Sequence, residues 1–346
     1  MTAAVVPPPA PEVRARAAER LAGLATPAGA LGRLGELGVW VSATQGVCPP
    51  EPLTEVRLVI FAGDHGVAQH GVSAYPPAIT PAMVRTFVLG KAGVSALAAA
   101  HGVHVRVLDL GVDDDLDGVP AGVQAHKVRR SSGAIHVEDA LSAAETARAF
   151  EVGRTVAREE IAAGAQLLLS GDMGIGNTTP ASAMVAAALG LPADEVTGRG
   201  TGVDDAALRH KQALVQQALD RAGARVADPM DALAALSSAD LVATTGYLVQ
   251  AAESGVPVLL DGLMSVACAL YAEQIAPGAT AWFAAGHRST EPAQALALDK
   301  LGLSPVLDLG LRLGEGSGAV AAVPVLRSAV ALLRDVALLA DLMPPE

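Results

Sequence analysis

Aromatic residues are scarce in this 346-residue chain, at 3% of the sequence, although hydrophobic residues make up 51%. The core must therefore be built from Ala, Val and Leu, with 36 glycines among them. Such a composition favours parallel strands that are covered by helices on both faces. At roughly 150 residues per domain, the length fits one large α/β domain or a large domain with a smaller appendage.

Cysteine and basic residues are also in short supply. The two cysteines, Cys48 and Cys268, exclude a disulfide framework and fit a reducing compartment. Lys and Arg number 24 against 36 Asp and Glu, which gives a net charge of -12. Nucleic acid and anionic membranes both attract basic surfaces, so neither is expected as a partner. An anionic small molecule stays compatible with this charge where cations are placed locally.

Neither the N-terminal segment nor the longest apolar runs have the features of a targeting or membrane-spanning sequence. Residues 1–11 are rich in Ala and Pro and lack the charged and apolar regions of a signal peptide. Apolar runs such as 181–191 are shorter than the roughly 20 residues that a bilayer requires. The sequence therefore predicts a soluble, cytoplasmic protein.

One unit recurs along the middle of the chain: a short run rich in Leu or β-branched residues, a turn with Gly and a polar residue, then a helical stretch. A single Asp after such a run is most simply explained as a helix cap. The prediction of a sheet therefore depends on the repetition of the unit and not on any one turn. Alternating strands and helices indicate a parallel sheet, with ligands bound outside the carboxyl ends of its strands. The five runs are residues 56–62, 103–110, 167–170, 256–260 and 281–285.

The two chain ends have helical patterns. Residues 11–41 precede a proline-rich linker at 48–52, and residues 317–342 form an Ala/Val/Leu-rich stretch in which Pro324 predicts a kink or a fresh helix start. We expect these ends to pack together. The predicted organisation is a small helical domain of residues 1–48 and 311–346 beside a large Rossmann-like α/β domain of residues 49–310.

Residues 171–180 form a glycine-rich loop suited to binding phosphate. The loop follows a strand and opens a helix, where backbone N–H groups and the helix dipole attract an anion. It lacks both the third glycine of the dinucleotide fingerprint and the Gly-Lys-Ser/Thr of a P-loop. A tight strand-to-helix turn capped by Asn177 or Thr178 is the alternative interpretation.

A second glycine-rich loop spans residues 198–202, Gly-Arg-Gly-Thr-Gly. Its Arg199 is a candidate bidentate partner for phosphate, and Lys211 follows on the next predicted helix. A solvated helix face is the alternative for this basic cluster.

A single carboxylate, Glu315, lies among three glycines in residues 312–318, directly before a helical run. Glycine neighbours allow a turn that brings backbone and side chain close to a ligand, so Glu315 is a candidate catalytic base. A polar turn capped by Ser317 is the alternative. His65, His70 and His287 lack zinc spacing, so neither a metal nor another cofactor is expected.

Taken in chain order, these motifs resemble the nicotinate-nucleotide:dimethylbenzimidazole phosphoribosyltransferases of cobamide synthesis. The resemblance implies an enzyme that moves the phosphoribosyl group of nicotinate mononucleotide onto a benzimidazole, giving α-ribazole phosphate and nicotinate. It also implies a Rossmann-like fold with a helical domain from both termini, and a homodimer. The matching segments are residues 63–67, 71–76, 174–179, 198–202, 261–262 and 312–318.

The resemblance implies Glu315 as general base and Asp172 as a second carboxylate, one methylene shorter than the usual family Glu. Ala82 stands where the family commonly has Gln, which indicates a different acceptor base, and Ala293-Gln294 replaces the usual Gly-His. The implied positions for the donor and its phosphate are Gly174, Gly176, Asn177, Thr178, Arg199, Gly200, Thr201, Gly202, Lys211, Asp261 and Ser289. The implied base pocket consists of Ser73, Tyr75, Ala82, Met83 and Leu313.

Two alternative functions follow from the same features. An NAD-dependent oxidoreductase explains a parallel sheet with glycine-rich turns, but its third glycine and strand-end acidic residue are not in the required places. A non-catalytic nucleotide-binding or regulatory homologue would keep the phosphate loops without needing Glu315. The shortened Asp172 keeps that second alternative open.

Overall fold

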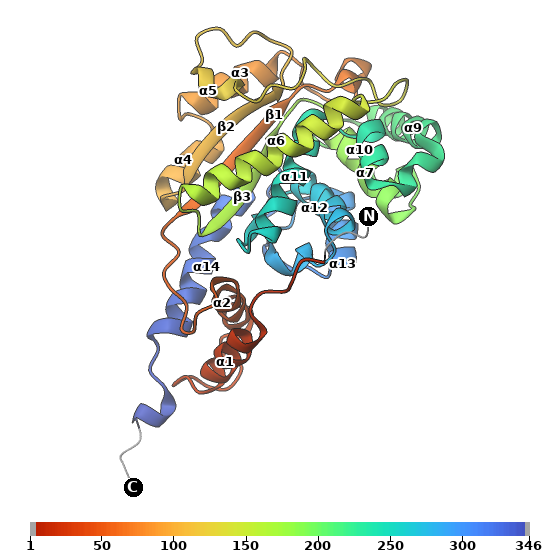
Figure 1. Ribbon diagram of the computed structural model, residues 1–346. Helices are drawn as coiled ribbons and strands as arrows, with labels where there is room; N and C mark the ends of the chain where they lie inside the picture. Colours follow the sequence, from red (N-terminus) through yellow and green to blue (C-terminus); the bar gives the residue numbers. More distant parts are fainter. Residues whose placement is uncertain (1–4, 343–346) are drawn as a thin grey trace.

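A six-stranded, wholly parallel sheet organises the chain in the computed structural model, which describes residues 5–342 (Figure 1). The strand order is β2-β1-β3-β4-β5-β6. The predicted α/β class and the five predicted strands are confirmed, whereas the edge strand β6 is too short to leave a pattern in the sequence. The strands are β1 Val56–Gly63, β2 His104–Gly111, β3 Leu167–Met173, β4 Val258–Leu260, β5 Phe283–His287 and β6 Pro305–Leu307.

The strands are buried on both faces because their apolar residues alternate between two cores. In β1, Leu58 and Ile60 pack into one core, while Val59 and Phe61 pack into the other. The first core contains α2 Gly32–Gln45, α3 Ile79–Val88, α4 Gly93–His101, α5 Ala121–Gln124 and α14 Ser317–Asp335. The second contains α6 Ala143–Ala162, α7 Thr178–Leu189, α8 Ala193–Val196, α9 Asp205–Ala222, α10 Pro229–Leu236, α11 Ala239–Glu253, α12 Leu263–Ile275 and α13 Pro292–Leu301.

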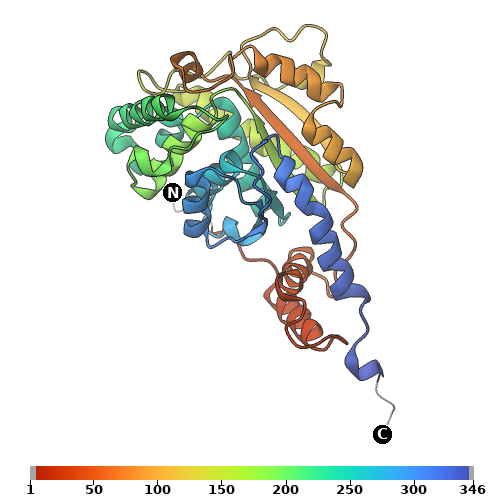
Figure 2. The same cartoon turned by 180° about the vertical axis from the view of Figure 1, so that it is seen from behind.

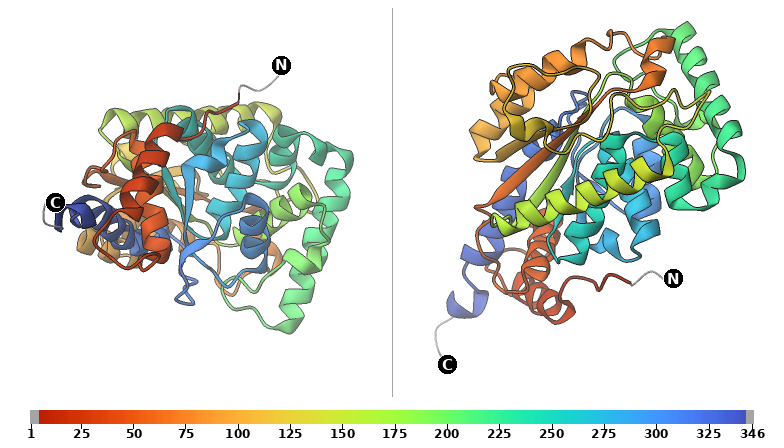
Figure 3. Two further views of the ribbon diagram at one scale, coloured as in Figure 1. Left: turned by 90° about the horizontal axis from the view of Figure 1, so that it is seen from below. Right: turned by 45° about the horizontal axis from the view of Figure 1, so that its top comes forward.

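Glycines bring α6 and α11 into backbone contact beneath the sheet. A Cβ atom on Gly153 would lie 1.8 Å from the Ala243 carbonyl oxygen, and one on Gly246 would lie 2.1 Å from the Phe150 carbonyl oxygen. The right-hand view of Figure 3 shows the long α6, in yellow-green, lying across the strands. This contact fixes the position of α11, whose first turn reaches the functional site described below.

Helices from the two ends of the chain lie side by side: α1 Pro11–Ala22 and α2 pack on the distal half of α14 (Figure 2). Arg20 donates from Nε to the Leu333 carbonyl at 2.7 Å and from Nη2 to the Arg334 carbonyl at 2.9 Å. The helix α14 continues through Pro324, so no fresh helix starts there. A separate terminal domain stays a prediction, and its residues 1–4 and 343–346 lie outside the described residues.

By length and composition, the segments Ile79–His101 and Ser317–Asp335 could each cross a membrane. The second segment is α14, and its Val320, Val323 and Leu326 are buried against the sheet. The first consists of two helices, α3 and α4, separated by a turn at Gly90. Packing within the fold accounts for the apolar character of α14, and the turn divides the other segment into two short helices.

Candidate active site

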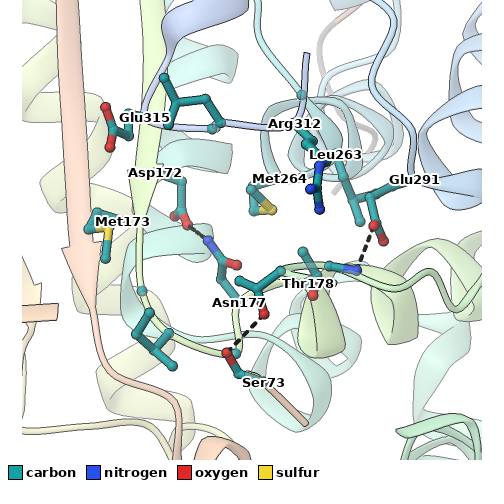
Figure 4. Close-up of a pocket in the computed structure, with 18 of the residues that line it drawn as sticks. Ser73, Asp172, Met173, Asn177, Thr178, Leu263, Met264, Glu291, Arg312 and Glu315 are labelled. Atoms are coloured by element: carbon teal, nitrogen blue, oxygen red, sulfur yellow. Dashed lines mark hydrogen bonds between the residues drawn. The ribbon is translucent and has the colours of Figure 1, made fainter. Parts of the chain in front are cut away.

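A cavity of about 390 Å³ opens at the carboxyl ends of the strands. From β1 the chain crosses to β2 on one side and then to β3 on the other, so the order of strands reverses between β1 and β3. Such a reversal leaves a crevice between the loops that follow the two strands. The loops after β1, β3, β4 and β5 line the cavity, together with residues 312–315 (Figure 4).

Glu315 lies in the cavity wall in a backbone conformation that is unusual for its residue type. Gly314, Glu315 and Gly316 have successive φ angles of 79°, 66° and 91°. The left-handed region costs a residue with a side chain about 1–2 kcal/mol, which the surrounding contacts must offset. The Val94 amide donates to Glu315 Oε2 at 3.1 Å, and only 7% of Glu315 is exposed. Burial raises the pKa of Glu315 above its ordinary value.

Asp261 holds the Glu315 loop from behind. Its Oδ2 accepts from the Gly316 amide at 3.1 Å, and its Oδ1 accepts from the Ala319 amide at 2.9 Å. Burial raises the pKa of Asp261, while His287, whose Nε2 is 3.5 Å from Oδ1, opposes the rise. Ser317 makes no capping hydrogen bond at the start of α14. The turn is therefore anchored by Asp261 and not by the predicted alternative, a serine cap.

Asp172 was predicted to lie in the glycine-rich loop of residues 171–180, but it belongs to β3, which extends to Met173. Its Oδ1 accepts from Asn177 Nδ2 at 2.6 Å (Figure 4). Asn177 precedes the first residue of α7 but does not cap the helix with its side chain. Burial, and next the neighbouring Asp240 carboxylate, raise the pKa of Asp172 well above its ordinary value.

Thr178, Gly200 and Thr201 form the side of the cavity suited to an anion. Lys211 lies directly behind them, fully buried, and donates from Nζ to Thr178 Oγ1 at 2.7 Å and to the Gly198 carbonyl at 3.1 Å. Burial lowers the pKa of Lys211 to about 8. The charge of Lys211 is therefore available to a phosphate below that pH, although its ammonium group does not line the cavity.

The structure brings most of the predicted site residues to this cavity. Arg199 is outside the lining: it donates to the Val203 carbonyl at 2.9 Å and to Asp205 Oδ1 at 2.5 Å, with half of its side chain exposed. Gly202, Lys211, Asp261 and Ala82 are also outside, and Ala82 is exposed on α3. The predicted residues that line the cavity are Ser73, Tyr75, Met83, Asp172, Gly174, Gly176, Asn177, Thr178, Gly200, Thr201, Ser289, Leu313 and Glu315.

Comparison with known proteins finds relatives that match nearly the whole chain. The profile of a family described as "Phosphoribosyltransferase" matches residues 6–342. The nicotinate-nucleotide–dimethylbenzimidazole phosphoribosyltransferase of Mycolicibacterium paratuberculosis is 52% identical over 99% of this chain and 97% of its own. The chain belongs to this family. A phosphoribosyltransferase of the same name from Mycobacterium leprae is 48% identical over the same shares of the two chains.

Solved structures show the same fold. CobT from Thermus thermophilus matches with a TM-score of 0.92 and 43% identity, over 96% of this chain and 98% of the other. A nicotinate-nucleotide-dimethylbenzimidazole phosphoribosyltransferase from the same organism matches with a TM-score of 0.90 and 41% identity, over 97% and 100% of the chains. The predicted family and its α/β fold are confirmed over nearly the whole chain.

Several residues of this phosphoribosyltransferase-family site were missed from the sequence. Leu263 and Met264 line the cavity from the first turn of α12, and nothing in their flanks distinguishes them from core residues. Glu291 accepts from the Gly200 amide at 2.8 Å through Oε1. Gln294 accepts from the Ser289 amide at 2.6 Å and donates to the Asp261 and His287 carbonyls. The replacement of the usual Gly-His of the family by Ala293-Gln294 was the one sequence feature that could have indicated the contacts of Gln294.

Proposed function

We propose that this protein transfers the phosphoribosyl group of nicotinate mononucleotide to dimethylbenzimidazole or a related base. The products are nicotinate and α-ribazole phosphate, which supplies the nucleotide loop of a cobamide. The observation that carries the proposal is the buried Glu315 in the wall of the cavity whose other side has backbone and hydroxyl groups suited to a phosphate. Family membership over residues 6–342 supports the same reaction.

The reaction requires one proton acceptor and no covalent nucleophile. The bond between the pyridinium nitrogen and C1′ breaks, and its electron pair neutralises the departing nicotinate ring. A nitrogen of the acceptor base forms the new bond to C1′ from the opposite face, which converts a β linkage into an α linkage. Glu315 takes the N–H proton of the acceptor base, an effect worth roughly 10²–10⁴-fold. Its raised pKa brings it nearer to the proton affinity of the group it must deprotonate.

The phosphate of the donor is assigned to Gly176, Thr178, Gly200 and Thr201 in this proposal. These residues line the cavity, and the N-terminus of α7 adds a favourable dipole. Lys211 supports the same position from behind through Thr178. Arg199 contacts its own loop and Asp205, so we assign it to holding the loop and not to the phosphate.

The acceptor base is assigned to the apolar part of the cavity near Tyr75, Met83 and Leu313. Ala82, which replaces the usual Gln, is on the exposed side of α3, so its effect on base selection would have to be indirect. A panel of dimethylbenzimidazole, benzimidazole, adenine and phenols tests this departure. The same ranking in the native protein and Ala82→Gln would show that Ala82 does not select the base.

The deciding experiment is incubation of the full chain with nicotinate mononucleotide and dimethylbenzimidazole, followed by chromatography for nicotinate and α-ribazole phosphate. Appearance of both products in equal amounts is expected. If no base in the panel releases nicotinate while the mononucleotide still binds, the non-catalytic binding protein is the better interpretation.

We also propose a cytoplasmic homodimer. The family resemblance supports it, and so do exposed apolar side chains: Tyr75 and Leu313 at the cavity, and Leu89 directly after α3. Sedimentation equilibrium should give twice the chain mass, and Leu89→Asp should shift the protein toward the monomer. A native chain that sediments as a monomer at micromolar concentration contradicts the proposal.

A further inference from the structure

Three buried ionisable side chains form a cluster that extends from the cavity wall into the protein. Asp172 lies near the end of β3, Asp240 in the first turn of α11, and His65 just after β1. They are 7%, 1% and 2% exposed, respectively. Asp172 is the register partner of Phe61, whose ring packs on Tyr247 of α11, so the Asp172 side chain points to the face of the sheet that α11 covers. On that face, Asp240 Oδ2 is 3.7 Å from His65 Nε2. The cluster therefore links a cavity residue to two residues outside the cavity.

The aspartate pair lacks donors for most of its oxygens. Asp172 Oδ2 and both oxygens of Asp240 find no hydrogen-bond donor among the described residues. A buried acceptor without a donor costs about 1–3 kcal/mol. Three such carboxylate oxygens in one cluster therefore indicate that a proton is bound to one of the two aspartates. One shared proton converts two facing acceptors into a donor and an acceptor.

Two glycines, Gly63 and Gly174, leave room for these side chains, because a larger residue at either position would collide with them. A Cβ atom on Gly63 would lie 2.3 Å from Asp240 Oδ1, and one on Gly174 would lie 2.5 Å from His65 Nε2. The N-terminal turn of α11 offers partial positive charge to an ionised Asp240. Asp172 lies on a strand, which offers no comparable dipole. The proton is therefore favoured on Asp172.

We infer that Asp172 and Asp240 share one proton, that this proton resides on Asp172 Oδ2 in the resting protein, and that Asp240 is the positioning residue that keeps Asp172 uncharged. The catalytic consequence of a neutral Asp172 rests on the proposed function. Because Asp172 is already neutral, it cannot accept the proton of the acceptor base, and Glu315 receives it. The Asn177 amide fixes the remaining oxygen of Asp172.

Three other titratable groups face the two aspartates. Asp261 faces Asp172 from the end of β4, Cys268 faces both aspartates from α12, and His65 faces Asp240 from beyond β1. Desolvation and then the Asp240 charge raise the pKa of Asp172. Removal of the Asp240 charge therefore lowers that pKa, since a neighbouring anion disfavours ionisation.

Infrared spectroscopy of the purified full chain without substrate tests the inference. The carbonyl stretch of a protonated carboxylic acid is followed against pH, and the Asp172 band is obtained by subtracting the same protein with Asp172→Asn. A band is expected at pH 7 in the native protein. In Asp240→Asn, the pH midpoint at which the band disappears should move down by about one pH unit or more. Asp64→Asn, another buried carboxyl beside His65, is the control and should leave the midpoint unchanged.

Two results would overturn the inference: no Asp172 band at pH 7, or a band whose midpoint is the same with and without the Asp240 charge. Asp240→Ser, checked by circular dichroism, replaces Asp240→Asn if that variant does not fold. These spectra need no turnover, so they stand apart from any failure of the proposed reaction.

Discussion

Glu315 has a strained backbone, with a φ angle of 66° in the left-handed region. Its left-handed backbone persists because Asp261 binds the amides of Gly316 and Ala319, while Val94 binds its carboxylate. The carboxylate is thus fixed in position before any substrate arrives, so that less ordering remains to be done during the reaction. The same burial that fixes it also raises its pKa.

Glu315→Gln should lower kcat by roughly 10²–10⁴-fold and leave donor binding nearly unchanged, because the amide fills the same space but cannot take a proton. In the native enzyme kcat/KM should fall as pH decreases through the raised pKa of Glu315, since the base is active only when ionised. The variant should lack this acid limb. Steady-state kinetics against pH measure both effects, and Glu36→Gln, on an exposed helix surface, is the control. Normal turnover in Glu315→Gln would remove Glu315 from the base role.

Lys211 provides a second prediction at the level of a single side chain. Its pKa of about 8 means that its positive charge is lost as pH rises through that value. The KM for nicotinate mononucleotide should therefore increase above pH 8, while Lys211→Met should have a high KM at every pH. Because Lys211 acts through Thr178, we expect the contribution of an ordinary hydrogen bond, about 1 kcal/mol, which corresponds to roughly 5-fold in affinity. Lys300→Met, exposed on α13, is the control. A pH-independent KM in the native enzyme would contradict this role.

At the scale of elements, the glycine contacts between α6 and α11 determine where Asp240 lies. The two helices approach so closely that neither Gly153 nor Gly246 has room for a methyl group. The first turn of α11 then reaches Gly63 at the end of β1 through the Asp240 side chain. Packing far from the cavity is thereby connected to the acid–base groups inside it.

Gly153→Ala and Gly246→Ala should each lower the free energy of unfolding by about 1–3 kcal/mol, because the added methyl group meets backbone that must shift. Urea denaturation followed by circular dichroism measures this change. The matched control is Gly122→Ala on α5, where an added Cβ atom contacts nothing within 4 Å. A loss of stability in the control equal to that in the two variants would show that the helix contact is not the cause.

Elements with a strong local signal were predictable from the sequence. The strands β1 to β5 have apolar runs followed by Gly, and Glu315 is flanked by glycines, so both were identified. The edge strand β6 has three residues and half-buried side chains, which leave no pattern. Asp240 lies in a helix that is buried on all sides, and its partner Asp172 is 68 positions away in the chain. Only the fold brings such residues together, so a single sequence without an alignment could not pair them.

At the scale of the whole molecule, the N-terminal helices α1 and α2 pack against the C-terminal helix α14. Arg20 from α1 binds the carbonyls at the end of α14, and Trp40 Nε1 from α2 donates to the Ala281 carbonyl at 3.1 Å. The first and last helices therefore stabilise each other and the adjoining edge of the sheet. The left-hand view of Figure 3 shows these helices, in red, beside the blue α14.

Arg20→Ala should lower the free energy of unfolding by about 1–3 kcal/mol, since the carbonyls of Leu333 and Arg334 lose a charged donor. Thermal unfolding monitored by circular dichroism is the measurement, and turnover at 25 °C should stay near the native value. Arg16→Ala, exposed on the same helix, is the control. Equal stability of the Arg20→Ala and Arg16→Ala variants would contradict the role of Arg20.

The helix α14 also gives the molecule a mechanical property. Its 19 residues form a rod of about 28 Å that begins two residues after Glu315 and ends among the N-terminal helices. A load applied at the distal end would reach the Glu315 loop through a single continuous helix. The distal turn of α14 is thus a suitable attachment point for a sensor domain intended to switch the enzyme by tension.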